Sequence, residues 1–263
     1  MACERRGVTI KVGLSRISVA FHSGERILRM KTRPTPPPEE RSDISSFFDA
    51  LWPDLPRGDL SAALVCVVPD LVETVASSWE ERTGRGPEIF SASGAPFAVD
   101  YRPPESLGAD RGAAAWGVWA RFGDRLGESF MVADFGTHTV TTVLARGRLL
   151  GGAILPGIPL MERALGAGRV DLVPGPTLRG REGVTGVRGI GSSTREGLFS
   201  GVVLGSVEAV SGLGRRAEEE VGEPLPVVLT GGLSPVVAPL FPSGVLVNRQ
   251  AVHYGAWRFL AGR

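Results

Sequence analysis

The opening segment of this chain has a second copy that begins halfway along the sequence. Each copy has an apolar strand, a tight glycine-containing turn, an alternating strand, and a second glycine turn into a third strand. Placing Val8–Leu28 over Met131–Gly151 aligns Gly13 with Gly136, Gly24 with Gly147, and Ile27 with Leu150. The repeat favours two lobes of similar topology. The alternative is two unrelated β-hairpins, because glycine turns between strands are common.

One aligned pair differs in charge, because Lys11 falls opposite Asp134. A carboxylate at the junction of a strand and a turn can hold a cation or orient a phosphate, whereas an ammonium group cannot ligate magnesium. Among the 29 basic residues only Lys11 and Lys31 are lysines, so a lysine here stands out in an arginine-rich chain. The first copy has therefore lost, or exchanged, the function of this position.

Strands and helices alternate along the rest of the chain, which favours an α/β fold with a duplicated opening in each lobe. We expect lobes at residues 1–125 and 126–263, facing each other across a cleft. The patterns predict helices at 71–82, 108–126, 194–221 and 251–260, a turn and helix at 156–168, and buried strands at 62–68 and 226–230. They also predict a short helix from Ser42 or Asp43 to Trp52, and a surface loop at 170–191.

The composition excludes several classes of function. The 263 residues carry a formal net charge of +1 and no basic run, so the electrostatic footprint of a nucleic-acid-binding protein is missing. No apolar run approaches the roughly 18 residues that span a bilayer, and the N-terminal segment has the pattern of a strand, not of a signal peptide. Cys3 and Cys66 are too few for a disulfide framework and lack zinc-ligand spacing. We expect a cytoplasmic protein that binds neither nucleic acid nor membrane.

Two glycine-containing segments that follow buried strands are candidates for ligand contact. In the segment 134–137, Asp134 offers a hard oxygen, Gly136 allows close approach of the backbone to a phosphate, and Thr137 offers a hydroxyl. The alternative is an ordinary Asx turn. Gly231 and Gly232 follow the strand at 226–230, where an adenine or ribose could pass close to the backbone.

The segment Gly108-Ala109-Asp110-Arg111 lies at a predicted helix start. Asp110 could accept a proton from a substrate hydroxyl, and Arg111 could bind a substrate carboxylate through its two-pronged guanidinium. The alternative is a first-turn acid that only stabilises the helix. The three histidines are scattered without metal-ligand spacing, so we interpret His22, His138 and His253 as structural.

Together these segments resemble the motifs of type III pantothenate kinases, in order and over essentially the whole chain. The resemblance rests on Val67–Pro69, Gly108–Arg111, Asp134–Thr137, Gly151–Gly157, Ser193–Thr194 and Thr230–Leu233. It implies a duplicated fold that is actin-like, sugar-kinase-like and ribonuclease H-like, a dimer, and ATP-dependent phosphorylation of pantothenate in coenzyme A biosynthesis. It also implies Mg²⁺ and a monovalent cation, K⁺ or NH₄⁺.

Carried over by position, the resemblance implies a role for each matching residue. Asp110 resembles the family's proton acceptor. The residues that resemble its pantothenate pocket are Tyr101, Gly108, Ala109 and Arg111. The residues that resemble the family's nucleotide-binding positions are Gly13, Ser15, Gly136, Thr137, Gly231 and Gly232. Asp134 resembles the ligand of the monovalent cation. Thr194 resembles a threonine that reaches pantothenate from the neighbouring protomer.

The departure from the family pattern lies in the first turn. The family has Asp-x-Gly-Asn-Thr in this phosphate loop, whereas this chain has Lys11-Val12-Gly13-Leu14-Ser15. Phosphoryl transfer depends on positioning and on charge neutralisation by a metal ion, so loss of the carboxylate predicts a poor kinase when this chain acts alone.

Three hypotheses follow. The first is a subunit of a heteromeric pantothenate kinase, in which a paralogous subunit brings the intact loop. The second is a non-catalytic regulatory or sensor protein on the kinase fold. The third is a divergent kinase in which Lys11 has a new role.

Overall fold

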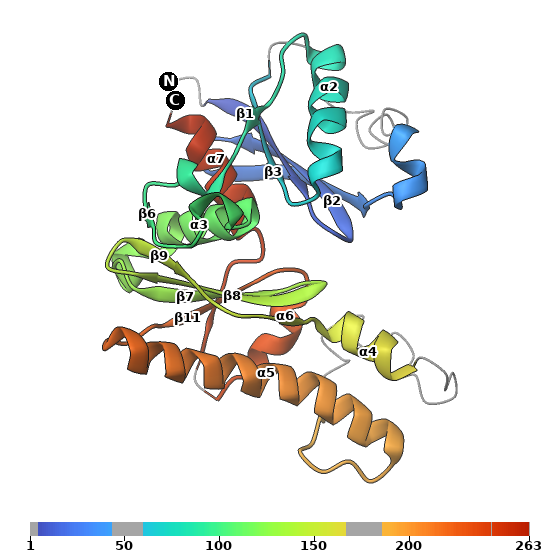
Figure 1. The fold of residues 1–263 in the computed structure, drawn as a ribbon, viewed down its shortest axis with the longest axis vertical. Helices are drawn as coiled ribbons and strands as arrows, with labels where there is room; N and C mark the ends of the chain where they lie inside the picture. Colours follow the sequence, from blue (N-terminus) through green and yellow to red (C-terminus); the bar gives the residue numbers. More distant parts are fainter. Residues whose placement is uncertain (1–4, 44–59, 167–185, 243, 263) are drawn as a thin grey trace. The chain divides into compact units, whose positions relative to one another are not determined.

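The computed structural model describes residues 5–43, 60–166, 186–242 and 244–262, which form two compact units (Figure 1). The first unit comprises Met1–Arg121 together with Ala251–Arg263, and the second comprises Phe122–Gln250. The expected lobes differ from these units chiefly in the C-terminal segment, which belongs to the first unit. The helix expected to end at Trp52 and most of the loop expected at 170–191 lie outside the described residues.

A mixed sheet forms the centre of the first unit, with the strand order β3-β2-β1-β4-β5. β1 and β2 are antiparallel, as are β2 and β3, whereas β4 runs parallel to β1. The strands of this sheet are β1 (Arg6–Val12), β2 (Arg16–Ser23), β3 (Arg26–Pro34), β4 (Ala62–Cys66) and β5 (Glu88–Ile89). The short strand β6 (Ala98–Val99), further along the chain, is not part of this sheet. The helices are α2 (Val72–Thr83), α3 (Ala109–Leu126) and α7 (Ala251–Ala261), with 3-10 turns η1 (Pro38–Asp43), η2 (Pro69–Leu71), η3 (Ala92–Gly94) and η4 (Pro104–Ser106).

Alternation along β1 gives the two faces of this sheet different characters. Val8, Ile10 and Val12 are fully buried and form a core cluster with Val75 and Trp79 of α2. Gly7, Thr9 and Lys11 alternate with these residues on the other face, and a Cβ on Gly7 would lie 2.9 Å from Cζ3 of Trp257 in α7. Small and polar residues on this second face therefore let α7 pack directly against the strand.

Helices α3 and α7 approach each other closely through two glycines. A Cβ on Gly117 of α3 would overlap the carbonyl oxygen of Ala251, and one on Gly255 of α7 would overlap that of Ala113. Only glycine allows backbones to meet at this separation. The contact holds the C-terminal helix in the first unit.

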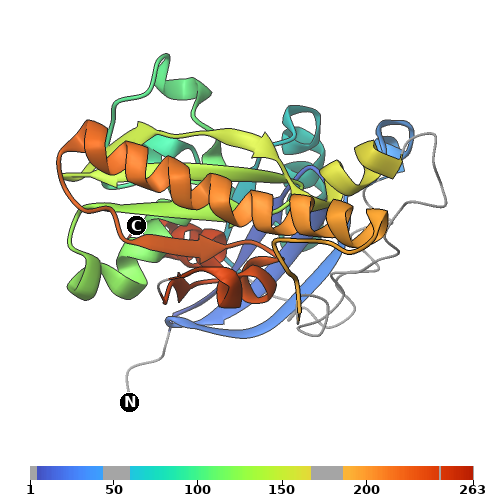
Figure 2. The same ribbon diagram turned by 90° about the horizontal axis from the view of Figure 1, so that it is seen from below.

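The second unit repeats the opening arrangement, and its strand order is β12-β11-β7-β8-β9, with β10 paired to β8. In Figure 2, α5 runs across the sheet formed by β7, β8 and β11. The strands are β7 (Phe130–Phe135), β8 (His138–Ala145), β9 (Arg148–Gly151), β10 (Ile154–Pro156), β11 (Val227–Thr230) and β12 (Leu246–Val247). The helices are α4 (Ile158–Gly166), α5 (Thr194–Val221) and α6 (Ser234–Val237), followed by the 3-10 turn η7 (Ala238–Leu240).

The structure confirms the repeated order of three antiparallel strands but corrects its register. Val12 pairs with Ile17 in the first copy, whereas Phe135 pairs with Thr139 in the second, so the first turn is one residue longer. Beyond this turn Gly24 corresponds to Arg146, and the two have φ angles of 53° and 51°. The expected matches of Gly24 with Gly147 and of Ile27 with Leu150 were therefore wrong by one position. The match of Lys11 with Asp134 precedes the longer turn and is unaffected.

Helix α5 is long and apolar enough to cross a membrane by length and composition, and among the described helices it alone meets that test. Its Val202, Val207 and Val210 are buried in the core of the second unit, together with Met131 and Leu229 of the sheet. This packing is the ordinary role of a core helix in a globular lobe.

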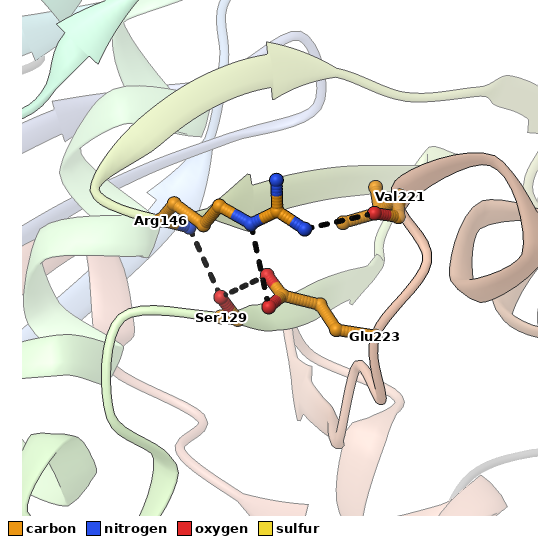
Figure 3. A network of polar contacts seen from close by, with 4 residues as sticks. All are labelled: Ser129, Arg146, Val221 and Glu223. Atoms are coloured by element: carbon orange, nitrogen blue, oxygen red, sulfur yellow. Dashed lines mark hydrogen bonds and ion pairs between the residues drawn. The ribbon is translucent and has the colours of Figure 1, made fainter.

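A polar network ties the turn between β8 and β9 to the end of α5 (Figure 3). The Arg146 backbone N–H donates to Ser129 Oγ at 3.0 Å, and its guanidinium donates to the Val221 carbonyl at 3.2 Å. Ser129 Oγ donates to Glu223 at 2.6 Å, and Arg146 Nε lies 3.5 Å from the same carboxylate. The network thus satisfies a carbonyl at the C-terminus of the helix with a cation, where a positive charge is favourable.

This network predicts a pH-dependent contribution to stability. The hydrogen bond from Ser129 lowers the pKa of Glu223, desolvation raises it, and Arg146 lowers it further, with a net decrease. A depressed folded pKa means that the stabilisation is complete above the unfolded pKa of about 4.3 and is lost as the pH falls through the folded value. We expect Glu223→Gln to lower the Tm at neutral pH and the deficit to shrink in acid. Glu219→Gln, at an exposed position of α5, is the control. A deficit that stays constant with pH would contradict this account.

Candidate active site

The structure brings Tyr101, Gly108, Asp110 and Arg111 together where α3 begins. A Cβ on Gly108 would lie 2.9 Å from Asp110 Oδ1, so the carboxylate folds back over this glycine. The Arg111 N–H donates to the Gly108 carbonyl at 3.0 Å. The guanidinium carbon of Arg111 lies 5.4 Å from the centre of the Tyr101 ring, within cation–π range, and Arg111 is only 8 % exposed. A carboxylate at a helix N-terminus therefore stands beside a buried cation.

A second group forms around Asp134 in the other unit. Asp134 pairs with Thr230 of the parallel strand β11, which brings the turn at Gly231 to the end of β7. A Cβ on Gly231, whose φ is +90°, would overlap Asp134 Oδ1 and lie 2.7 Å from the Phe135 carbonyl oxygen. Gly136 also faces the carboxylate, because its Cβ would lie 3.4 Å from Asp134 Oδ1. The two glycine segments expected to contact a ligand are thus adjacent.

Gly157 packs against the turn formed by Gly136 and Thr137. A Cβ there would overlap the carbonyl oxygens of Gly136 and Thr137, and the Gly157 N–H donates to the Thr137 carbonyl at 3.0 Å. Gly232 has open space around it, since no atom of the described residues lies within 4 Å of its Cβ position. The structure therefore gathers Asp134, Gly136, Thr137 and Gly231 with the Gly151–Gly157 segment in one place.

The turn that follows β1 is fastened by Thr35, just beyond β3. Thr35 Oγ1 donates to the Gly13 carbonyl at 2.6 Å, and the Thr35 N–H donates to the Ser15 carbonyl at 3.1 Å. Gly13 N–H donates across the turn to the Arg16 carbonyl at 2.9 Å. Leu14 is 55 % exposed at the tip. Three carbonyl oxygens of this turn thus accept hydrogen bonds within the chain.

A polar chain that the sequence did not reveal joins β1, β2 and α7. Thr9 Oγ1 lies 2.9 Å from His22 Nε2 and 2.8 Å from His253 Nδ1, and His253 Nε2 lies 2.8 Å from Ser18 Oγ. The His22 ring stacks on Trp257 with centroids 4.8 Å apart. Burial lowers the pKa of His22 to about 4. Burial, the positive charge of Lys11 and repulsion from His22 when it is protonated lower the pKa of His253 to about 3. Both rings are neutral at physiological pH.

Thr194 is the first residue of α5, as the sequence predicts. Ser193 caps the helix by accepting the Glu196 N–H at 3.2 Å, and Glu196 accepts the Ser192 N–H at 2.7 Å. These two hydrogen bonds fix the helix start as in a capping box, except that Glu196 accepts from the residue before the cap. Thr194 is exposed in the chain by itself.

A sequence profile of type III pantothenate kinases matches residues 8–216. The chain belongs to this family. A type III pantothenate kinase of Thermomicrobium roseum is 36% identical over 73% of this chain and 71% of its own length. The type III pantothenate kinase of Roseiflexus castenholzii is 33% identical over 88% of this chain and 89% of its own length.

Solved structures show the fold of this type III pantothenate kinase family member. A Campylobacter jejuni protein described as a conserved Baf family transcriptional activator superimposes with a TM-score of 0.63 at 16% identity, over 97% of this chain and 98% of its own. A ROK family glucokinase of Streptomyces griseus, solved with glucose and AMPPNP, superimposes with a TM-score of 0.54 at 14% identity, over 98% of this chain and 100% of its own. The expected two-lobe, sugar-kinase-like α/β fold is thereby confirmed.

Proposed function

We propose that this chain is a subunit of an ATP-dependent pantothenate kinase that converts pantothenate to 4′-phosphopantothenate in coenzyme A biosynthesis. Family membership carries the proposal, and the grouping of Asp110, Arg111 and Tyr101 supports it. We place the protein in the cytoplasm, with pantothenate, ATP and a paralogous subunit as its partners and without nucleic acid or membrane.

On the acceptor side, each residue of this chain's own pocket has the chemistry for its task, although turnover takes place in the pocket of the paralogous subunit. Asp110 can accept the proton of the pantothenate hydroxyl, and Arg111 can bind the pantothenate carboxylate. Tyr101 holds the guanidinium by the contact described above, while Gly108 and Ala109 leave room for the substrate beside the backbone. Thr194 would complete the pocket of the neighbouring subunit.

On the nucleotide side, the residues that we assign to ATP contacts are Gly13, Ser15, Gly136, Thr137, Gly231 and Gly232. Asp134 is our candidate ligand for K⁺ or NH₄⁺, because its Oδ1 and the Phe135 carbonyl oxygen both border the same glycine. These ions would offset phosphate charge.

A divalent metal does not fit the first turn of this chain. Mg²⁺ requires oxygen ligands in octahedral geometry, whereas Lys11 presents an ammonium group and the neighbouring carbonyls accept protein hydrogen bonds. In the described part of the chain, no group of three or more His, Cys, Asp or Glu could hold a metal ion. We infer that the metal-dependent step takes place in a pocket whose phosphate loop a paralogous subunit provides.

The test is reconstitution. The purified chain alone is expected to phosphorylate pantothenate negligibly, and mixing it with a homologue that has the aspartate in place of Lys11 is expected to produce a stable complex with turnover. The homologue alone is the control. Ordinary turnover by this chain alone would establish a divergent kinase instead. Neither complex nor turnover would refute the heteromeric proposal and favour a regulatory protein.

A further inference from the structure

We propose that the turn 11–15 binds phosphate groups of a polyphosphate ligand through the Lys11 ammonium group and the Ser18 hydroxyl, with no divalent metal at that turn. This inference deepens the proposed function, because it assigns the nucleotide-binding turn of this chain a ligand chemistry of its own.

The position of Lys11 fits this role. It lies near the end of β1, directly opposite Ser18 of β2, on the face of the sheet that carries Thr9. A Cβ on Gly13 would lie 4.0 Å from Lys11 Cε, so the lysine side chain extends alongside the turn. Its compact charge suits a phosphate as a point contact.

Hydrogen bonds to the backbone carbonyls of the turn also favour an anion at this place. Backbone carbonyls repel phosphate oxygens, but those of Gly13 and Ser15 accept hydrogen bonds from Thr35, and that of Arg16 accepts one from Gly13. Their lone pairs are therefore partly neutralised by groups of the chain itself. The same bonds make these oxygens poorer ligands for a metal.

The hydrogen bonds of the buried polar chain determine whether the Ser18 hydroxyl donates or accepts toward His253. Thr9 Oγ1 can donate its single proton to only one of its two histidine partners. If both imidazoles donated to it instead, its own proton would have no acceptor among the described residues, so two polarities of the chain remain. In one polarity His22 Nε2–H donates to Thr9, Thr9 donates to His253 Nδ1, and His253 Nε2–H donates to Ser18. The proton of Ser18 is then available to an external acceptor next to Lys11.

The remaining nitrogen of His22 agrees with that polarity. His22 Nδ1 is buried and has no hydrogen-bond partner among the described residues. In the chosen polarity it carries a lone pair, whereas in the reverse polarity it would be a buried N–H without an acceptor. Unpaired buried N–H groups are rarer than unpaired acceptors. The favoured arrangement therefore leaves Ser18 as a donor beside a cation, which suits an anion and not a metal ion.

The lysine content of the chain makes a direct test possible. Lys11 and Lys31 are its only side-chain amines, and both are partly exposed in the same sheet. The probe is inorganic tripolyphosphate in EDTA, followed by brief amine acetylation and peptide mass spectrometry. We expect at least about fivefold slower acetylation of Lys11 and an unchanged rate at Lys31. No protection, equal protection of both lysines, or protection only with Mg²⁺ would overturn the proposal.

Substitutions of the two lysines provide a second test of the phosphate site. By calorimetry in EDTA, Lys11→Met should weaken tripolyphosphate binding about 10- to 100-fold, the loss of one charged hydrogen bond, while Lys11→Arg and the control Lys31→Met retain it. Unchanged affinity of a folded Lys11→Met protein would refute the site. Phosphate binding without pantothenate turnover in the complex would overturn only the proposed function. Turnover with no phosphate binding by Lys11 would overturn only this inference.

Discussion

Thr194→Ala is expected to lower kcat/KM for pantothenate in the reconstituted complex by about 10- to 100-fold. The basis is the proposed arrangement, in which this hydroxyl contacts pantothenate in the partner's pocket and a lost hydrogen bond to a polar or charged substrate costs this much. Lys11→Ala should have a smaller effect, because turnover uses the other subunit's phosphate loop. Steady-state kinetics of the two complexes measures the difference.

Two further variants make this experiment specific. Thr194→Ser keeps the hydroxyl and should retain most of the activity, whereas a defect common to both substitutions would indicate damage to the helix start. Asp110→Asn in this chain should cost less than Thr194→Ala. A loss of 10²- to 10⁴-fold from Asp110→Asn, the usual contribution of a general base, would show that this chain's own pocket turns over and contradict the division of labour.

Local patterns predicted the elements of the fold well. The helix expected at 194–221 matches α5, because Ser193 is a strong N-cap and Gly222 is a left-handed C-cap. The expected buried strands at 62–68 and 226–230 correspond to β4 and β11. These features depend on neighbours in sequence, which a single chain displays directly.

Register and long-range packing were not predictable in the same way. The extra residue in the first turn is invisible to an ungapped alignment, since the glycines of both copies still nearly coincide. The placement of the C-terminal helix depends on its contact with α3 through Gly117 and Gly255, which lie far apart in sequence. The same holds for the buried polar chain, because Thr9 joins His22 to a histidine near the other end of the chain.

The candidate site was partly predictable because its motifs are short. Asp110 and Arg111 are adjacent in sequence, and their relation to Gly108 follows from the first turn of a helix. The proximity of Asp134 to Gly231 required the parallel pairing of β7 with β11, which the sequence alone suggested only through the family resemblance. The roles assigned to these residues remain predictions.

Gly117→Ala and Gly255→Ala are expected to destabilise the first unit by about 3 kcal/mol or more each, at the upper end of overpacking effects. The added methyl group would overlap a backbone carbonyl oxygen of the facing helix, and neither backbone can shift without separating α3 from α7. All five tryptophans of the chain lie in segments of the first unit, so tryptophan fluorescence during urea unfolding reports on this unit.

Gly201→Ala and Gly205→Ala in α5 are the matched controls, and the opposite sign is expected for them. No atom of the described residues lies within 4 Å of either Cβ position, so only helix propensity changes and each substitution should stabilise the second unit by about 0.5–1 kcal/mol. Circular dichroism at helical wavelengths measures this gain. Because propensity favours alanine at all four positions, the difference in sign isolates the backbone contact of α3 with α7. A neutral or stabilising effect at Gly255 would show that the two helices do not meet as closely as the structure indicates.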